Sequence, residues 1–231
     1  MTAVLEDKDI YLSSFASFEK QQASDPRWLA QLRQSAIDRF AAVGFPTLDD
    51  EEWRSTPLSA LTRIPFQRAH GAPQEPPTET TLGHTLTGKD WTQLLFVNGR
   101  FVRLLPTTAE LATGASVGNL AQALRSEPAA LKDHLGRHAD IEDNAFIALN
   151  TAFLADGAVI RLPKQCVNRQ PIHLIFLALP DAEPTVSHPR NLLVLEAHSQ
   201  ATVIESYLSA GAGASFTNSV TEVVLGEGAH L

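Results

Sequence analysis

Two histidines have the spacing that is closest to that of a metal site in this chain. His134 and His138 are four positions apart, which would place both imidazoles on one face of a helix. This spacing can bind zinc. A zinc protease also needs a glutamate next to the first histidine as general base, whereas here Gly136 lies between the two. We therefore interpret the pair as structural.

The other reactive side chains also have structural interpretations. The run Asp49–Glu52 could bind a divalent cation or act in acid–base catalysis. It is contiguous and lacks the spaced ligands of a calcium loop, so we interpret it as a solvated turn. Cys166 could be a nucleophile or an iron–sulfur ligand. Clusters usually need several thiolates and the chain has one cysteine, so we interpret it as a structural or surface thiol. His188, His198 and His230 lie at breaks between apolar runs and are predicted to be surface turn residues.

Common catalytic motifs are missing from the sequence. There is no G-x-S-x-G, no P-loop and no dinucleotide fingerprint. The Gly-Ala-Gly-Ala at 211–214 follows an apolar run, but no helical pattern follows it, so it is no phosphate loop. We predict no catalytic, cofactor-binding or metal-binding residue in this chain.

Composition narrows the classes of partner. The net charge is −8, from 18 basic and 26 acidic residues, and no run of Lys and Arg stands out. This argues against nucleic acid and against an anionic membrane surface as partners. No apolar run approaches the ~20 residues of a membrane helix. The first residues lack the pattern of a signal peptide, and a single cysteine allows no internal disulfide. A cytoplasmic protein is expected.

Helices are predicted in the N-terminal region, residues 1–62. An apolar stripe predicts a short helix over residues 8–22. A second helix is predicted to be capped by Ser24 or Asp25 and to end just before Gly44. This second helix is expected to pack on its own domain rather than on a membrane surface.

The middle of the chain divides at a stretch rich in proline and threonine. Residues 63–90 are predicted to be an exposed linker. Residues 91–157 are predicted to lead into the core, with a β-hairpin at 91–105 and helices at 118–136 and 143–154. The hairpin is signalled by Asn98-Gly99, since both residues tolerate the positive φ of a type I′ turn.

Residues 158–231 are predicted to be all β. Strand patterns occupy 158–162, 172–178, 191–196, 201–208 and 219–225, with Gly and Pro at the breaks. Leu192–Leu195 is apolar at every position, so this strand must be covered on both faces. Periodicity alone does not separate a sandwich from a β-helix or a barrel, and no close internal repeat is evident.

Three stretches together resemble the SufD family, the scaffold subunits of the SUF iron–sulfur cluster assembly system. They are DDEEWRSTPL at 49–58, FVNGRFV at 96–102, and SHPRNLLVLEAHSQATVIESYLS followed by FTNSVTEVVLGEGAHL within 187–231. The last is the most specific, because its parts occur in family order. The resemblance covers most of residues 28–231. Ser55 departs from the pattern, which usually has an aromatic residue there.

The resemblance implies a helical N-terminal region followed by a right-handed parallel β-helix. It also implies a non-catalytic scaffold that works with a SufB-like subunit and a SufC-like ATPase of the ABC type. The iron–sulfur cluster would then belong to the complex, with no cluster ligand carried over to residues 1–231. We expect the chain to be the N-terminal portion of a SufD-like protein, with an incomplete β-helix over 158–231. The exposed edge of the final turn predicts self-association.

Two other functions remain open from the residues alone. Parallel β-helix proteins include polysaccharide lyases, which need clustered charges along a strand face. Here the strands carry isolated charges, namely Arg161, Glu196, Glu205 and Glu222. The second alternative is a β-rich binding module, which secretion would favour.

Overall fold

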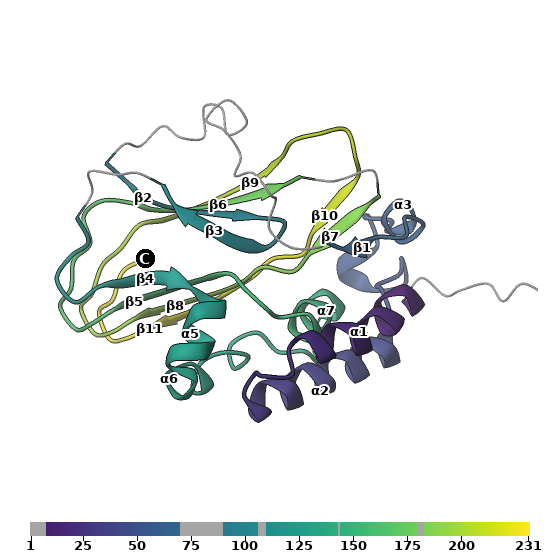
Figure 1. Cartoon of the computed structure of the whole chain (residues 1–231), viewed down its shortest axis with the longest axis horizontal. Coiled ribbons are helices and arrows are strands. Elements are labelled where there is room, and N and C mark those ends of the chain that lie inside the picture. Colours follow the sequence, from purple (N-terminus) through teal and green to yellow (C-terminus); the bar gives the residue numbers. More distant parts are fainter. Residues whose placement is uncertain (1–7, 70–89, 106–109, 143, 180–182) are drawn as a thin grey trace, which may run out of the picture.

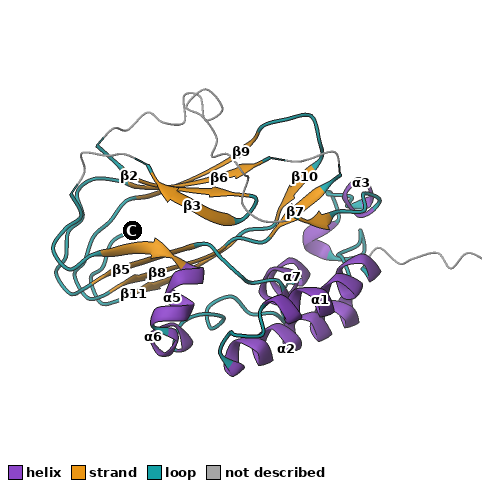
Figure 2. Ribbon diagram, viewed as in Figure 1, coloured by secondary structure: helices purple, strands orange, loops and turns teal. Residues whose placement is uncertain are grey.

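The molecule is mainly β, with its helices gathered against one side of the sheets (Figure 1 and Figure 2). This computed structural model describes residues 8–69, 90–105, 110–142, 144–179 and 183–231. Most of the predicted linker, residues 70–89, therefore lies outside the described residues. Among the residues described, no helix is both long and apolar enough to cross a bilayer.

The two predicted N-terminal helices are confirmed. Helix α1 spans Asp9–Gln21 and α2 spans Arg27–Val43, ending at Gly44 with a φ of 67°. The predicted cap of α2 is wrong, because Pro26 precedes its first residue and no side chain caps it. Asp25 instead pairs at 2.7 Å with Arg33, which is buried and donates to the carbonyl of Leu154.

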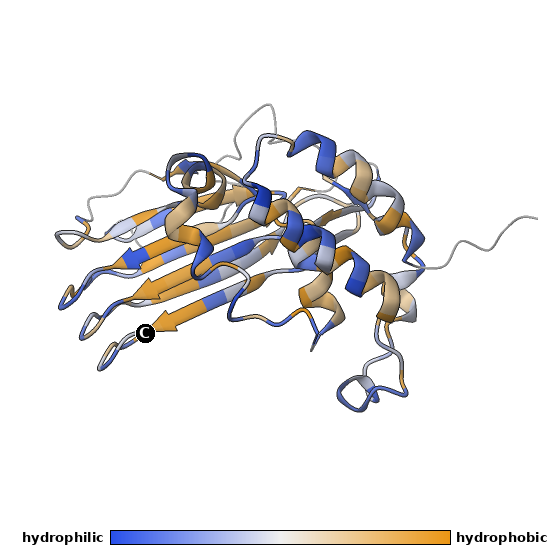
Figure 3. Ribbon diagram, turned by 90° about the horizontal axis from the view of Figure 1, so that it is seen from below, coloured by the Kyte–Doolittle hydropathy of each residue, from blue (hydrophilic) through white to orange (hydrophobic). Residues whose placement is uncertain are grey.

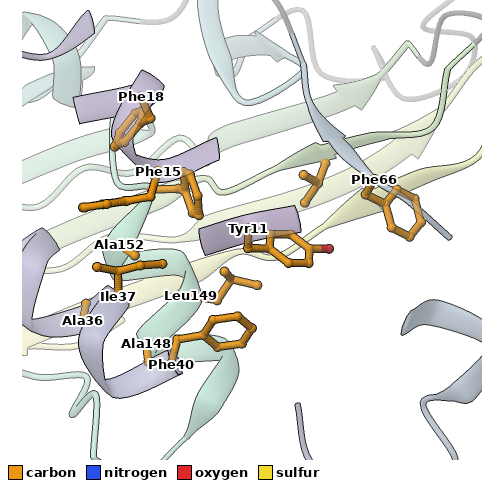
Figure 4. Packing of buried hydrophobic residues seen from close by; sticks show 12 residues of the cluster. Tyr11, Phe15, Phe18, Ala36, Ile37, Phe40, Phe66, Ala148, Leu149 and Ala152 are labelled. Atoms are coloured by element: carbon orange, nitrogen blue, oxygen red, sulfur yellow. The ribbon is translucent and has the colours of Figure 1, made fainter. Parts of the chain in front are cut away.

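Three helices share one aromatic-rich core. Helix α7 spans Ala145–Ala152 and is capped by Asn144, whose side chain accepts from the N–H of Phe146 at 2.8 Å. It fulfils the helix predicted at 143–154. The core contains Tyr11, Phe15 and Phe18 of α1, Ala36, Ile37 and Phe40 of α2, and Ala148, Leu149 and Ala152 of α7 (Figure 4). Two short elements follow α2 in the chain, the 3-10 helix η1 (Glu51–Trp53) and α3 (Ser59–Thr62).

The predicted hairpin is confirmed, and the helical stretch after it is shorter than predicted. Strands β2 (Thr92–Val97) and β3 (Arg100–Leu104) pair antiparallel around Asn98 and Gly99, whose φ angles are 50° and 75°. The stretch 118–136 divides into α5 (Leu120–Ser126) and α6 (Pro128–Lys132). An additional strand, β4 (Ser116–Asn119), precedes α5 and pairs antiparallel with the first strand of the β region.

All five strands predicted after residue 157 are present, within two residues at each end. They are β5 (Ala158–Leu162), β6 (Ile172–Ala178), β8 (Arg190–Leu195), β9 (Val203–Ser209) and β11 (Val220–Leu225). Two strands of three residues were not predicted, β7 (Thr185–Ser187) and β10 (Ser215–Thr217). A two-residue strand, β1 (Gln67–Arg68), pairs with β7.

The β region repeats one path of three strands. Strands β6, β7 and β8 form one winding, and β9, β10 and β11 form the next. Each strand pairs in parallel with its counterpart, as in Ile172 with Val203, Thr185 with Ser215, and Arg190 with Val220. The paired positions are 30 or 31 residues apart, so the chain does contain an internal repeat.

The turns after β5, β8 and β11 repeat as well. Gln165, His198 and Gly228 occupy equivalent places in them, and all three have a φ near 60°. The turns are joined by bonds between windings, from the N–H of Gln165 to Ala197 and from that of His198 to Glu227, at 2.9 and 2.8 Å. A left-handed residue at one fixed place in each turn therefore keeps the windings in register.

Two facing sheets enclose the apolar interior of the β region (Figure 2). The described strands form sheets of order β3-β2-β6-β9, β4-β5-β8-β11 and β1-β7-β10. Leu193 and Leu195 face the interior between the sheets, while Leu192 packs outward with Leu29 and Leu120 of the helices. The strand over Leu192–Leu195 is thus covered on both faces, as predicted.

Candidate functional site

The two ends of the β region differ in the direction of their outermost strands. At one end, two of the sheets finish on antiparallel strands, β3 and β4, which break the parallel pattern. At the other end, every described sheet finishes on a strand of the same winding: β9, β10 or β11. Figure 3 shows β11 as the outer strand of its sheet, near the C-terminus. We call this second end the free edge.

Apolar side chains gather at the free edge. Val223 and Leu225 pair with the interior residues Leu193 and Leu195, yet they are 38% and 50% exposed. Tyr207 is 46% exposed and ends a stack of aromatic rings. Phe96 stacks on Phe176 with centroids 4.9 Å apart, and Phe176 stacks on Tyr207 at 5.1 Å. The interior of the β region is therefore uncovered at this end.

A polar network holds these side chains in place. The Glu205 carboxylate accepts hydrogen bonds from Tyr207 Oη at 2.6 Å and from Thr221 Oγ1 at 2.7 Å. Asn191 Nδ2 donates to the same carboxylate at 3.2 Å. Partial burial of the phenol group, and then the neighbouring Glu205, raise the pKa of Tyr207 well above its usual value, so it stays a neutral hydrogen-bond donor. The aromatic face of Tyr207 is thus fixed in orientation.

Such an edge can bind further β-structure. Edge strands present backbone N–H and C=O groups that pair readily with another strand. Here three edges lie together around an exposed apolar interior, so an incoming winding would gain backbone pairing and apolar burial at once. The free edge of residues 1–231 therefore offers backbone and apolar groups that can associate with another strand.

A buried ion pair joins the helices to the winding that forms the free edge, β9–β11. Arg190 of β8 and Glu222 of β11 are fully buried, and Arg190 Nε donates to Glu222 Oε1 at 2.9 Å. Glu222 also accepts from the N–H groups of Gly136, Arg137 and His138 at 2.8–3.0 Å. Arg190 Nη1 donates to Asn150 and Thr151 of α7, at 3.1 Å each. From the sequence alone, Glu222 is only an isolated charge on a predicted strand.

The candidate metal ligands do not converge. Helix α6 ends at Lys132, so His134 and His138 lie in the turns after it, with ring centroids 6.0 Å apart. Within the described ranges, no group of three His, Cys, Asp or Glu residues is arranged to hold a metal ion. The run Asp49–Glu52 is exposed, and Asp50 accepts from the N–H of Thr47 at 2.7 Å, as in a local turn. Cys166 is buried in the core between the sheets.

One of the three turn histidines was predicted wrongly. His198 and His230 are exposed, as expected, but His188 is buried. It stacks on Phe153 with ring centroids 5.2 Å apart. Burial, together with the positive charge of Arg68, lowers the pKa of His188 from 6.5 to about 3. The helices cover this turn, which no local sequence pattern reveals.

Comparison with known proteins gives a consistent result over nearly the whole chain. Residues 6–174 match the family model of the SufBD protein N-terminal region, and residues 178–231 match that of the SUF system FeS cluster assembly SufBD core domain.

Individual relatives agree with these matches. An iron–sulfur cluster assembly SufBD family protein of Synechocystis is 31% identical, over 88% of this chain and 46% of its own length. The iron–sulfur cluster assembly protein SufD of Escherichia coli is 25% identical, over 86% and 44%. A SufBD family protein of Arabidopsis thaliana, named as chloroplastic, is 26% identical, over 90% and 39%. The chain spans about half the length of the relatives it matches, or less. It belongs to the SufBD family of SUF-system iron–sulfur cluster assembly proteins.

Proposed function

We propose that this chain is part of a scaffold subunit of the SUF iron–sulfur cluster assembly complex and acts through protein contacts. The observation that carries the proposal is the match to both the N-terminal region and the core domain of the SufBD family. The cluster is the cargo of the complex in this proposal. We place the complex in the cytoplasm.

The windings of residues 158–231 are, in this proposal, turns of a right-handed parallel β-helix. Parallel pairing at offsets of 30 to 33 residues supports this, as do the stacked turns at Gln165, His198 and Gly228. In such a fold each turn contacts only its neighbours, which fits the pairing of each described winding with the one beside it.

The proposed partners are a SufB-like subunit and a SufC-like ATPase. The test is co-purification of the full-length, tagged gene product with the SufB-like and SufC-like proteins of the same organism, at low salt. A stable complex is expected, and it should persist after size-exclusion chromatography. Failure of both proteins to associate would contradict the scaffold role.

The contacts of the strand charges do not favour a carbohydrate-active enzyme. Arg161 pairs with Glu127 at 2.7 Å, and Glu222 pairs with Arg190. Glu205 is held within its polar network, and Glu196 accepts from the N–H of Lys164 at 3.2 Å. Each of these charges thus has a structural role, and they do not line one strand face as a lyase site requires.

A further inference from the structure

A pocket of about 580 Å³ lies where α1, β1, the β2–β3 hairpin and α5 meet. Three arginines line it: Arg68 of β1, Arg100 of β3 and Arg125 of α5. They are far apart in the sequence, which is why the chain shows no basic run. Folding therefore creates a concentration of positive charge in a chain whose net charge is −8.

The carboxylate in this pocket is already used by the fold. Asp156 is the single acidic residue among the described lining residues, and it is buried. Its Oδ2 accepts from the N–H of Phe101 at 2.8 Å. Its Oδ1 accepts, at 3.0 Å each, from Asn119 Nδ2 and from the N–H groups of Ala121 and Gly157. Four donors thus satisfy Asp156, and no arginine pairs with it in the contacts described.

The three arginines have no counter-charge of their own in the described chain. Arg68 donates to the neutral Gln21 Oε1 at 2.5 Å, and its guanidinium lies 4.9 Å from the centroid of the Phe18 ring. The side chains of Arg100 and Arg125 make no hydrogen bond or ion pair with any described residue. Burial, followed by the positive charge of Arg100, lowers the pKa of Arg68, so the two cations repel each other. An anion between them would relieve this repulsion.

We propose that Arg68, Arg100 and Arg125 bind a small oxyanion carrying at least two negative charges. Guanidinium groups bind carboxylate and phosphate oxygens through paired N–H donors, and Arg does so better than Lys. The pocket volume falls within the roughly 300–1,000 Å³ of small-molecule sites. Gln122 adds a neutral amide to the lining. The shared chemistry is that of phosphate esters and polycarboxylates, and an acidic protein disfavours a polyanion such as nucleic acid.

Isothermal titration of the chain with inorganic pyrophosphate, and separately with citrate, tests the proposal at constant ionic strength. At least one of the two is expected to bind with a stoichiometry of one. Arg100→Ala and Arg125→Ala should each weaken binding by about tenfold or more. Pyrophosphate binding alone would identify phosphorylated compounds as the ligand class, and citrate binding alone would identify polycarboxylates.

Arg103→Ala is the matched control, because Arg103 is exposed on the same strand as Arg100 and does not line the pocket. It should change the affinity by less than about twofold. Arg125 is exposed on α5, so its variant remains informative if Arg100→Ala folds poorly. The proposal is overturned if neither anion binds with a Kd below about 1 mM. It is also overturned if Arg103→Ala weakens binding as much as Arg100→Ala does.

Discussion

The buried pair of Arg190 and Glu222 connects the helices to the β windings and should contribute strongly to the stability of the fold. Glu222→Gln removes the negative charge and leaves the guanidinium buried without a counter-ion. We expect a loss of about 3–5 kcal/mol in the free energy of unfolding, because breaking a buried pair leaves a charge away from water without its counter-ion. Urea unfolding followed by circular dichroism measures this loss.

The exposed pair of Arg161 and Glu127 provides the control for that experiment. Its side chains are 24% and 45% exposed, so Glu127→Gln should cost less than about 1 kcal/mol. Combining Glu222→Gln with Arg190→Met should recover part of the loss, since the stranded charge is then removed. Equal losses of unfolding free energy in Glu127→Gln and Glu222→Gln would show that the buried pair stabilises the fold no more than the exposed pair does.

His188 gives the fold a specific dependence on pH. The imidazole of His188 has a pKa of about 3 in the folded chain and of about 6.5 in the unfolded chain. The unfolded state therefore takes up more protons below pH 6.5, and stability is lost as pH falls from there toward 3. The slope from this group approaches about 1.4 kcal/mol per pH unit.

Unfolding midpoints measured from pH 7 to pH 5 test this dependence. The wild-type chain should lose stability over this range, and His188→Gln should flatten the loss. The exposed His138→Gln is the control and should keep the wild-type slope. An unchanged slope in His188→Gln would mean that another group causes the loss.

At the scale of elements, Gly157 sets how closely β5 can approach β8. Its φ is 154°, and a Cβ there would lie 2.1 Å from the carbonyl oxygen of Arg190. Gly157→Ala should therefore cost more than about 2 kcal/mol, because a rigid backbone cannot move aside as a side chain would. Gly118 of β4 is the matched control, since nothing lies within 4 Å of a Cβ built there. Gly118→Ala should leave the thermal midpoint within a few degrees of wild type.

Individual strands could be predicted from the sequence, but the repeat that orders them could not. The five predicted strands are rich in Val, Ile and Leu and lie between Gly and Pro breaks, and their ends agree with prediction to within two residues. The windings repeat in position rather than in residue type. Leu192 and Glu222, for example, are paired positions of different type. Leu192 packs on the helices, whereas Glu222 binds an arginine. Strands β7 and β10 are too short for any period to be detected.

The candidate site was harder to predict for a related reason. Alternation marks Tyr207 and Val223 as strand residues, but exposure depends on which strand ends each sheet. Strand order is a long-range property that no local pattern contains. The same holds for Arg68, Arg100 and Arg125, which folding brings to one pocket. The burial of His188 likewise depends on helices that lie far from it in sequence.

At the scale of the whole molecule, the two ends of the β region have opposite tendencies. The antiparallel strands β3 and β4 interrupt the parallel register at one end, which hinders continued stacking. The free edge keeps that register and exposes Tyr207, Val223 and Leu225. Association of this chain should therefore occur through one end.

This asymmetry predicts that residues 1–231, prepared alone, self-associate through the free edge. Light scattering coupled to size-exclusion chromatography should give a mass that rises with concentration above the 25.1 kDa of the monomer. Val223→Lys combined with Leu225→Lys should abolish the rise, because charges at an edge strand oppose further pairing. Leu104 of β3 is 53% exposed at the opposite end, so Leu104→Lys is the control and should leave the rise unchanged. A constant 25.1 kDa species in the wild-type chain would show that the free edge does not drive association by itself.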